Sequence, residues 1–295
     1  MQRVDSEITR LIKEIDYDEV TNLFNKLQGG KRLRAGLILK IAPTCTTAPL
    51  LGAIVELIHA ASLLHDDVID EATLRRGVAS INATDGSKTA VMLGDILYSK
   101  AFSELVAFDK EIAKVISSSV TALSKGEMMD VKMASAFNSD EERYLEMLYL
   151  KTATLIEACA HAAALLAQKD ALSHSIYGKN LGLSFQIIDD ILDITSDEAT
   201  LGKPAMNDFV EGKCTLPYIY LYQHLGEEDR EKLSSLHAKA LSRDESIWIR
   251  EMMQQHKTIE KSFALAQKLS NEAMSVIKDD TELVEILQTM IKRSY

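Results

Sequence analysis

Apolar side chains along this chain fall three or four positions apart, which is the spacing of one face of an α-helix. In residues 5–27 they are Ile8, Leu11, Ile12, Ile15, Val20, Leu23, Phe24 and Leu27. Similar patterns predict helices from about residue 33 to 41 and over residues 50–69, 88–106, 109–135, 140–168, 170–195 and 216–224, with more charged helices from 227 to the end. Residues 43–49, 71–88 and 196–213 predict loops, the second with short helical pieces.

The pattern predicts an all-α protein. No segment shows the sustained alternation of apolar and polar residues that a half-buried strand would show. No repeat of fixed period and no linker rich in glycine, serine or proline divides the chain. We therefore predict one domain over residues 1–295, a bundle of roughly ten or more helices around a central cavity.

Composition supports this prediction and limits the partners of the protein. Only 4 prolines and 13 glycines occur in 295 residues, and 46% of the residues are hydrophobic. Such a chain favours helices and can bury a large core. The formal net charge of −11 argues against nucleic acid as a partner. Cys45, Cys159 and Cys214 lie far apart, which is typical of reduced thiols and not of a disulfide framework.

The distribution of charge predicts a cytoplasmic protein without a membrane span. The N-terminal segment MQRVDSEITRLIKEIDYDE is rich in charge and lacks the apolar core of a signal peptide. Residues 153–167 are taken as the most apolar stretch, but they are too few to cross a membrane and include Glu157 and His161.

Two segments with the pattern DDxxD, each in a mostly apolar helical stretch, are the main candidates for chemistry. Their aspartates are Asp66, Asp67 and Asp70 in the first segment and Asp189, Asp190 and Asp193 in the second. The first and last aspartates of each segment are four residues apart, so they project from the same helical face. Carboxylates held together repel each other unless a cation lies between them. Magnesium is usually bound by one or two carboxylates and substrate phosphates, so we predict Mg²⁺ sites facing each other across the bundle.

Basic residues lie near both clusters in the sequence, although the chain as a whole is acidic. Lys31 and Arg34 stand three residues apart at an expected helix start, where both the helix terminus and the arginine favour phosphate. The others are Arg75 and Arg76 after the first cluster, Lys203 and Lys213 after the second, and Lys151 beside Thr152 at the start of an apolar stretch. Acidic clusters with basic neighbours are expected where a metal–diphosphate substrate binds.

These segments resemble those of trans-isoprenyl diphosphate synthases, also called polyprenyl synthetases, and most of all the octaprenyl and other medium- or long-chain members. The matching segments follow the family's order over about two-thirds of the chain: GGKRLR at 29–34, LLHDDVIDEATLRRG at 63–77, GDILYSKAF at 94–102, GEMMD at 126–130, KTATL at 151–155, FQIIDDILD at 185–193 and GKPAMNDFVEGKCTLP at 202–217. The resemblance implies the isoprenoid synthase fold and a homodimer.

The resemblance also implies roles for individual residues. The principal magnesium ligands would be Asp66, Asp70 and Asp189, with Asp67, Asp190 and Asp193 as supporting carboxylates. Isopentenyl diphosphate would bind Lys31, Arg34, His59 and Arg76, and the allylic diphosphate would bind Arg75, Lys151, Lys203 and Lys213. Thr152 and Gln186 would line the reacting centre, and together with Lys151 and Lys203 they are the candidate catalytic residues.

The implied reaction joins isopentenyl diphosphate to an allylic primer, which is dimethylallyl, geranyl or farnesyl diphosphate, and gives an all-trans polyprenyl diphosphate. Diphosphate leaves the primer with help from magnesium and the basic residues, the double bond attacks the allylic cation, and a proton is lost. The segment 196–213 would close over the site and exclude water. The chain departs from the family at Ala35, where proline is usual, and at Met206, where glycine is frequent.

Small residues before the first cluster predict a long product. Ser62 lies one helical turn before Asp66 on the same face, Ala61 is beside it, and Ile58 lies a further turn away. Family members with short products carry aromatic residues near positions 61 and 62. Since one helical turn, about 5.4 Å, is close to the length of an isoprene unit, we predict about six to eight units. Two alternatives stay open: a short-chain synthase for farnesyl or geranylgeranyl diphosphate, and small residues that serve only close helix packing.

Three other classes of protein share part of this pattern. A terpene cyclase would have an Asn-Ser-Glu motif in place of the second cluster, but the register of Asn180 and Ser184 continues with Ile188. A di-iron bundle needs two Glu-x-x-His motifs, and only Glu56 to His59 fits. A regulatory subunit of a heteromeric synthase would tend to lose its aspartate motifs. Chain elongation by a self-sufficient homodimer fits the sequence best.

Overall fold

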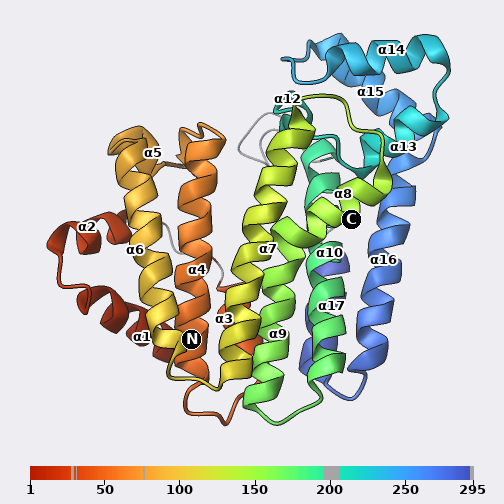
Figure 1. The fold of residues 1–295 in the computed structure, drawn as a ribbon. Coiled ribbons are helices and arrows are strands. Elements are labelled where there is room, and N and C mark those ends of the chain that lie inside the picture. Colours follow the sequence, from red (N-terminus) through yellow and green to blue (C-terminus); the bar gives the residue numbers. More distant parts are fainter. Residues whose placement is uncertain (28–29, 31, 76, 196–205, 293–295) are drawn as a thin grey trace. The chain divides into compact units, whose positions relative to one another are not determined.

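Helices make up 78% of the structure, a computed structural model that describes residues 1–27, 30, 32–75, 77–195 and 206–292 (Figure 1). The all-α prediction is therefore confirmed. By its internal contacts the chain divides into two units. Unit 1 comprises Met1–Val120 and Ala158–Ser175, and unit 2 comprises Thr121–Glu157 and Ile176–Tyr295. A single domain over residues 1–295 stays a prediction.

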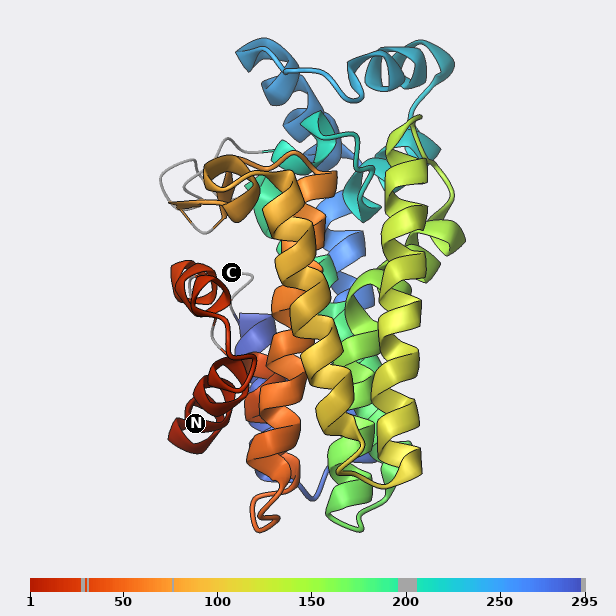
Figure 2. The ribbon, with the colours of Figure 1, turned by 60° about the vertical axis from the view of Figure 1, so that its left-hand side comes forward.

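Helix α4 (Ala48–Ile69) is the central element of unit 1. It packs against α1 (Gln2–Lys13), α3 (Leu33–Ile41) and α6 (Ser87–Leu105), and Figures 1 and 2 both draw α6 alongside it. A helix that is apolar on all sides is expected to be buried. In length and composition α4 could cross a membrane, with a mean hydropathy of 1.5, but 67% of that window is buried inside the protein. It is longer than the apolar stretch 153–167, which the sequence predicts to be too short to cross a membrane.

The N-terminal residues form two helices and not the single one predicted over 5–27. Helix α1 ends at Lys13, and α2 (Asp18–Lys26) begins after a turn in which Asp16 adopts the left-handed conformation, with φ 56°. Periodicity alone does not reveal this break, because the apolar residues keep a helical spacing across it.

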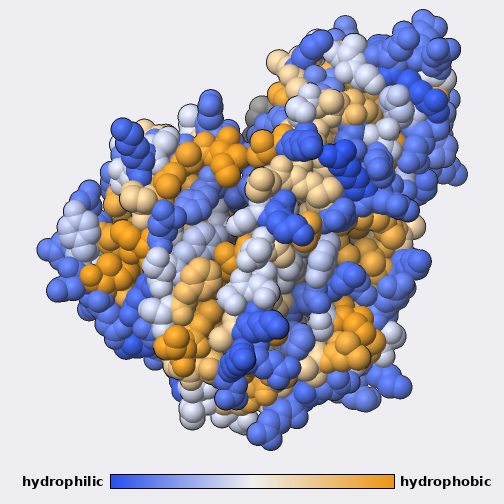
Figure 3. Space-filling view, in the orientation of Figure 1, coloured by the Kyte–Doolittle hydropathy of each residue, from blue (hydrophilic) through white to orange (hydrophobic). Residues whose placement is uncertain are grey.

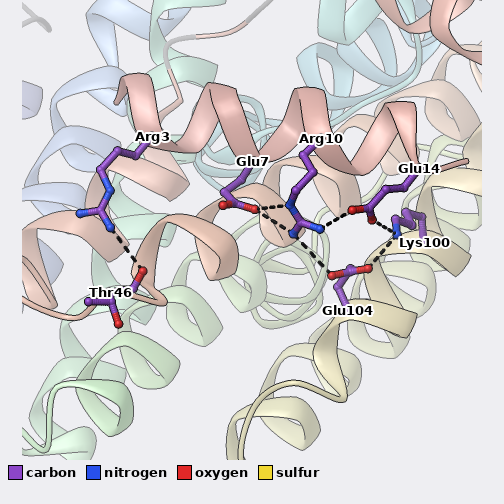
Figure 4. Close-up of polar contacts among 7 residues, drawn as sticks. All are labelled: Arg3, Glu7, Arg10, Glu14, Thr46, Lys100 and Glu104. Atoms are coloured by element: carbon purple, nitrogen blue, oxygen red, sulfur yellow. Dashed lines mark hydrogen bonds and ion pairs between the residues drawn. The ribbon is translucent and has the colours of Figure 1, made fainter.

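A network of ion pairs joins α1 to α6 (Figure 4). Arg10 contacts Glu7 at 2.8 Å and Glu14 at 2.6 Å, both on its own helix, and Glu104 of α6 at 3.7 Å. Lys100 of α6 contacts Glu14 at 2.8 Å and Glu104 at 2.7 Å. Arg10 and Glu14 are partly exposed, and ion pairs at exposed positions contribute little to stability.

The expected loop 71–88 contains a small hairpin that the sequence did not predict. Strands β1 (Leu74–Arg75) and β2 (Val78–Ala79) pair antiparallel, with Gly77 at φ 77° in the turn between them. A short helix, α5 (Ile81–Thr84), then leads into α6. Two-residue strands carry too little alternation to be visible in a sequence pattern.

Three long helices, α7 (Lys110–Ala134), α9 (Thr154–Leu166) and α10 (Ala171–Thr195), contribute residues to both units. The predicted helix 140–168 is interrupted. It consists of α8 (Glu141–Leu148), one π-helical turn η1 (Tyr149–Ala153) and α9. Such π-helical turns are rare and often occur at functional sites.

The rest of unit 2 is helical. Its elements are α12 (Asn207–Val210), α13 (Leu216–His224), α14 (Glu227–Leu236), α15 (Arg243–Gln255), α16 (Thr258–Val276) and α17 (Thr281–Lys292). Helix α13 packs on α15 and α16, and its buried residues join α10 in one apolar core. A capping box at Ser242 and Glu245 fixes the start of α15. The surface over α14 and α15 is largely hydrophilic (Figure 3).

Candidate active site

The first aspartate cluster occupies the C-terminal end of α4. Asp66 is half-buried and Asp70 is exposed, whereas Asp67 is only 5% exposed. The Asp67 carboxylate accepts a hydrogen bond from Arg75 Nε at 2.7 Å and lies 2.5 Å from the second nitrogen of the same guanidinium. Arg75, which the resemblance assigned to the allylic diphosphate, therefore also holds the middle carboxylate of the cluster.

The hairpin after α4 is tied to the same helix end. Asn82 donates to the carbonyl oxygens of Asp67 at 3.0 Å and Ala72 at 2.9 Å, and Ser80 donates to Ala72 at 2.6 Å. These bonds fix β1, and with it Arg75, relative to the aspartates.

His65 is a residue of α4, and its ring packs against α6. Its ring stands 5.6 Å from that of Tyr98, and a Cβ atom on Gly94 would lie only 2.3 Å from its Nε2, so the glycine makes room for the ring. Burial and then the charges of Asp66 and Asp95 raise the pKa of Tyr98 well above its usual range. The sequence gives His65 no catalytic role, and its packing gives no reason to add one.

The second aspartate cluster lies on α10 in unit 2, and its last residue, Asp193, is buried, unlike Asp70 in the first. Asp189 is exposed, and the middle residue, Asp190, is only 4% exposed. The Asp190 carboxylate accepts hydrogen bonds from Tyr144 Oη of α8 and, at 3.0 Å, from Gln186 Nε2. Burial, and then the negative charge of Asp208, raise the pKa of Asp190 to about 8.

Asp193, the last aspartate of this cluster, caps α12. Its side chain accepts the backbone N–H of Asp208 at 3.1 Å, and its carbonyl oxygen accepts the N–H of Met206 at 2.8 Å. Met206 is buried and has φ 62°, a conformation that glycine adopts more easily. The departure from glycine at this position therefore carries some backbone strain, which the Asp193 contact helps to hold.

Lys151 and Thr152 both lie in the π-helical turn η1. Lys151 Nζ contacts Glu127 at 2.8 Å and Asp130 at 2.5 Å, both on α7. Burial alone would lower the pKa of Lys151, but these two carboxylates outweigh it and hold that pKa above its usual value. Thr152 Oγ1 donates to Gln186 Oε1 at 3.3 Å, so two residues expected at the reacting centre are in contact.

Two glycines let neighbouring helices approach this turn closely. A Cβ atom on Gly126 of α7 would lie 2.4 Å from the backbone nitrogen of Lys151. A Cβ atom on Gly182 of α10 would lie 2.6 Å from Cα of Ala153. No other residue type fits at either position without displacing the turn.

The structure describes some of the remaining predicted site residues and not others. Arg34 of α3 and His59 of α4 are half-buried in unit 1, and Lys213 of unit 2 pairs with Glu211 at 2.8 Å. Lys31, Arg76 and Lys203 lie outside the described residues, as do residues 196–205 of the expected lid.

The predicted chain-length residues lie on α4 before the first cluster. Ile58 and Ala61 are fully buried, and Ser62 is half-buried. The Ser62 hydroxyl donates to the carbonyl oxygen of His59 at 2.9 Å, so this polar group is satisfied within its own helix.

Several residues of the site were not assigned a role from the sequence. Glu127 and Asp130 belong to the segment GEMMD, which the resemblance quoted, but only the structure pairs them with Lys151. Tyr144 lies 46 residues before Asp190, and the local sequence pattern does not predict the hydrogen bond between them.

The donor set is suited to a divalent cation that is shared with a substrate. Among the described residues, no three carboxylate, histidine or cysteine side chains gather closely enough to hold a metal ion alone. Magnesium usually takes one or two carboxylates and completes its shell with water and phosphate oxygens, so Asp66 with Asp70 in the first cluster and Asp189 in the second suffice. The Arg75 guanidinium beside the first cluster also suits phosphate.

An all-α fold with two such aspartate clusters defines a class of enzyme: metal-dependent enzymes that act on prenyl diphosphates. The chain belongs to the polyprenyl synthetase family, whose sequence model matches residues 17–255. It is thus a trans-prenyltransferase that uses isoprenyl diphosphates, in a family that uses a divalent metal. The predicted family is confirmed, and the terpene cyclase and di-iron hypotheses are excluded.

Individual relatives support this assignment. The octaprenyl pyrophosphate synthase from Helicobacter pylori has 43% sequence identity and a TM-score of 0.94, over 98% of this chain and 97% of that one. A short chain isoprenyl diphosphate synthase from Methanothermobacter thermautotrophicus is 34% identical over 249 residues, which are 80% of this chain and 77% of the relative. The polyprenyl synthase from Caulobacter crescentus, crystallised with calcium and isoprenyl diphosphate, is 28% identical with a TM-score of 0.83, over 98% of both chains.

Proposed function

We propose that this enzyme condenses isopentenyl diphosphate with an allylic primer in the presence of Mg²⁺, and that its product has about six to eight isoprene units, on the scale of one unit per helical turn. The observation that carries the proposal is the shared design of the two clusters. In each, the middle aspartate is buried and held by partners, Arg75 for Asp67 and Tyr144 with Gln186 for Asp190. The first aspartate in each, Asp66 or Asp189, is more exposed.

The proposed metal ligands are Asp66 and Asp70 in one cluster and Asp189 in the other, with the three remaining aspartates in support. When bound, magnesium would neutralise the diphosphate and stabilise it as a leaving group. The proposed cationic contacts to isopentenyl diphosphate are Lys31, Arg34, His59 and Arg76, and those to the allylic diphosphate are Arg75, Lys151, Lys203 and Lys213.

Thr152 is proposed to face the allylic carbon as the diphosphate leaves. Its hydroxyl hydrogen is donated to Gln186, so the lone pairs of Oγ1 remain to face positive charge. Gln186 is oriented in turn by its bond to Asp190. This chain of hydrogen bonds presets dipoles at the reacting centre, which is an effective form of transition-state stabilisation.

The length of the product is proposed from the small residues at 61 and 62. A long product is also supported by the similarity to the octaprenyl pyrophosphate synthase, while the similarity to the short chain synthase keeps the short-chain alternative. We further propose a cytoplasmic homodimer without a membrane span or a nucleic-acid partner, in keeping with the net charge of −11.

Chromatography of the products made from radiolabelled isopentenyl diphosphate tests the proposal. The wild type is incubated with dimethylallyl, geranyl or farnesyl diphosphate, with Mg²⁺ or with a chelator. We expect a Mg²⁺-dependent product of about six to eight units. A wild-type product of four units or fewer, by the same scale, would favour the short-chain alternative.

Two variants test the chain-length residues. Ser62→Tyr places a ring at a half-buried position, and Ala61→Tyr places one at a fully buried position. Both should shorten the product, and Ser62→Tyr should do so with the smaller loss of thermal stability. If both variants make the wild-type product, the small residues serve helix packing and not chain length.

A further inference from the structure

The start of α3 lacks a capping group of its own. The N-cap position is occupied by Arg32, whose side chain has no hydrogen-bond acceptor and whose backbone is left-handed, with φ 51°. A helix start needs acceptors for its first N–H groups, and a non-glycine residue in this conformation is held there by its surroundings.

Glu56 of α4 supplies the missing acceptor from 21 residues further along the chain. Its Oε1 accepts the backbone N–H of Ala35 at 3.1 Å, and its Oε2 lies 3.6 Å from the Arg32 guanidinium. The Glu56 side chain is only 6% exposed. A second acid, Asp5 of α1, lies 3.5 Å from the other side of Arg32, but its side chain is 53% exposed.

The negative charge of Glu56 offsets positive charge at the start of α3. The segment before and within the first turn of α3 carries Lys31, Arg32 and Arg34, yet the N-terminus of a helix disfavours cations. The Cys159 thiol is buried, and burial raises its pKa to about 12. The positive charge of Arg34 lowers this pKa and the negative charge of Glu56 raises it. Glu56 thus brings one buried negative charge to the start of α3, next to Arg32.

We propose that Glu56 is a positioning residue for isopentenyl diphosphate: it caps α3 and holds Arg32, and so positions the first turn of α3, where Arg34 is proposed to bind this substrate. His59, another expected contact of the same substrate, lies three residues after Glu56 on α4. One glutamate therefore couples two elements of one substrate site. The inference rests on the proposed function, because it assumes that Arg34 and His59 bind isopentenyl diphosphate and not the allylic primer.

The test is steady-state kinetics with each substrate varied in turn, on the full-length wild type, Glu56→Gln and Glu56→Ala. Glu56→Gln keeps an acceptor for the Ala35 N–H and loses the charge, whereas Glu56→Ala loses both. We expect the KM for isopentenyl diphosphate to rise in Glu56→Ala by about tenfold or more, since misplacing a binding group by about 1 Å can cost about 100-fold. Glu56→Gln should show a smaller rise, and the KM for the allylic primer should stay within about twofold in both.

Asp5→Asn is the matched control, because it removes the exposed ion pair of Arg32 and leaves the buried one. Its KM values should equal those of the wild type. If Glu56→Ala fails to fold, Glu56→Gln still decides the question, since its acceptor keeps the cap.

Each other outcome has a defined meaning. A rise of equal size in both KM values, no rise in either, or the same rise in Asp5→Asn would overturn the role of Glu56 while leaving the proposed function intact. A wild type that makes no product from isopentenyl diphosphate with any primer would refute the proposed function, and the inference would fall with it.

Discussion

At the scale of single residues, Tyr144 is the partner that the second cluster depends on. Its hydroxyl donates to the buried Asp190, which also holds Gln186. We expect Tyr144→Phe to lower the free energy of unfolding by about 1–3 kcal/mol, the cost of leaving a buried polar group without a partner. We also expect kcat to fall by about tenfold, the usual effect of losing a group that orients ligating side chains.

Tyr177→Phe provides the control for this prediction. Tyr177 is also fully buried in unit 2, and its hydroxyl donates to the carbonyl oxygen of Leu283 at 3.0 Å, in a contact that includes no proposed site residue. Chemical denaturation and kinetics of both variants separate the two effects. Tyr177→Phe should lose stability without losing kcat, and an equal loss of kcat in both variants would mean that Tyr144 has only a structural role.

The sequence predicts which aspartates form the two clusters, but not which of them are buried and which are exposed. Spacing places Asp66 with Asp70 and Asp189 with Asp193 on one helical face. It cannot tell that Asp67, Asp190 and Asp193 are buried, because their partners come from other elements. These partners are Arg75, Tyr144 and Asp208. The same limit applies to Glu56: its pattern with His59 suggested iron, whereas its contact with Ala35 ties it to α3. Contacts between distant residues are a property of packing and not of periodicity.

At the scale of elements, the π-helical turn η1 depends on the glycines that face it. Gly126→Ala and Gly182→Ala should each destabilise the protein by about 1–3 kcal/mol, the usual cost of overpacking. Because the added Cβ of Gly126→Ala meets Lys151 and that of Gly182→Ala meets Ala153, both should also lower kcat. Circular dichroism melts and initial rates measure the two effects.

Gly36→Ala is the control for these two variants, because the structure has space for the added Cβ atom at this position. The nearest atom to its added Cβ would be Met1 Cε at 3.8 Å, and Gly36 lies inside α3. This variant should therefore gain up to about 1 kcal/mol of stability, since alanine is the better helix former. Wild-type rates in the Gly126 and Gly182 variants would show that the position of η1 does not matter for catalysis.

Most elements could be predicted from the chain itself, and the exceptions have physical causes. Helices α6, α7, α10 and α13 fall within one or two residues of their predicted bounds, because long apolar patterns decide them. The break at Asp16 and the turn η1 were missed. A single left-handed residue or one extra residue in a turn leaves the apolar spacing almost unchanged.

At the scale of the whole molecule, the two clusters belong to different units of the chain, Asp66 and Asp70 to unit 1 and Asp189 to unit 2. The sequence indicated their common purpose through their shared pattern, and membership of the polyprenyl synthetase family agrees with it. Product length depends instead on the size of the space that the product chain fills. If the product chain runs along α4, as proposed, that space depends on packing along the whole helix and its neighbours, so two small residues could suggest its length only approximately.

Binding of magnesium and inorganic pyrophosphate should stabilise the protein as a whole. Like charges in each cluster repel each other, and a ligand that binds only the folded state raises its stability by about 2.7 kcal/mol at 100 times its Kd. In thermal melts we expect Tm to rise by roughly 5–10 °C with both ligands, and by less with either alone. Asp66→Asn and Asp189→Asn should each lose most of this rise. Asp18→Asn, an exposed acid in the first turn of α2, should keep it. A full rise in either cluster variant would show that its aspartate does not hold the metal.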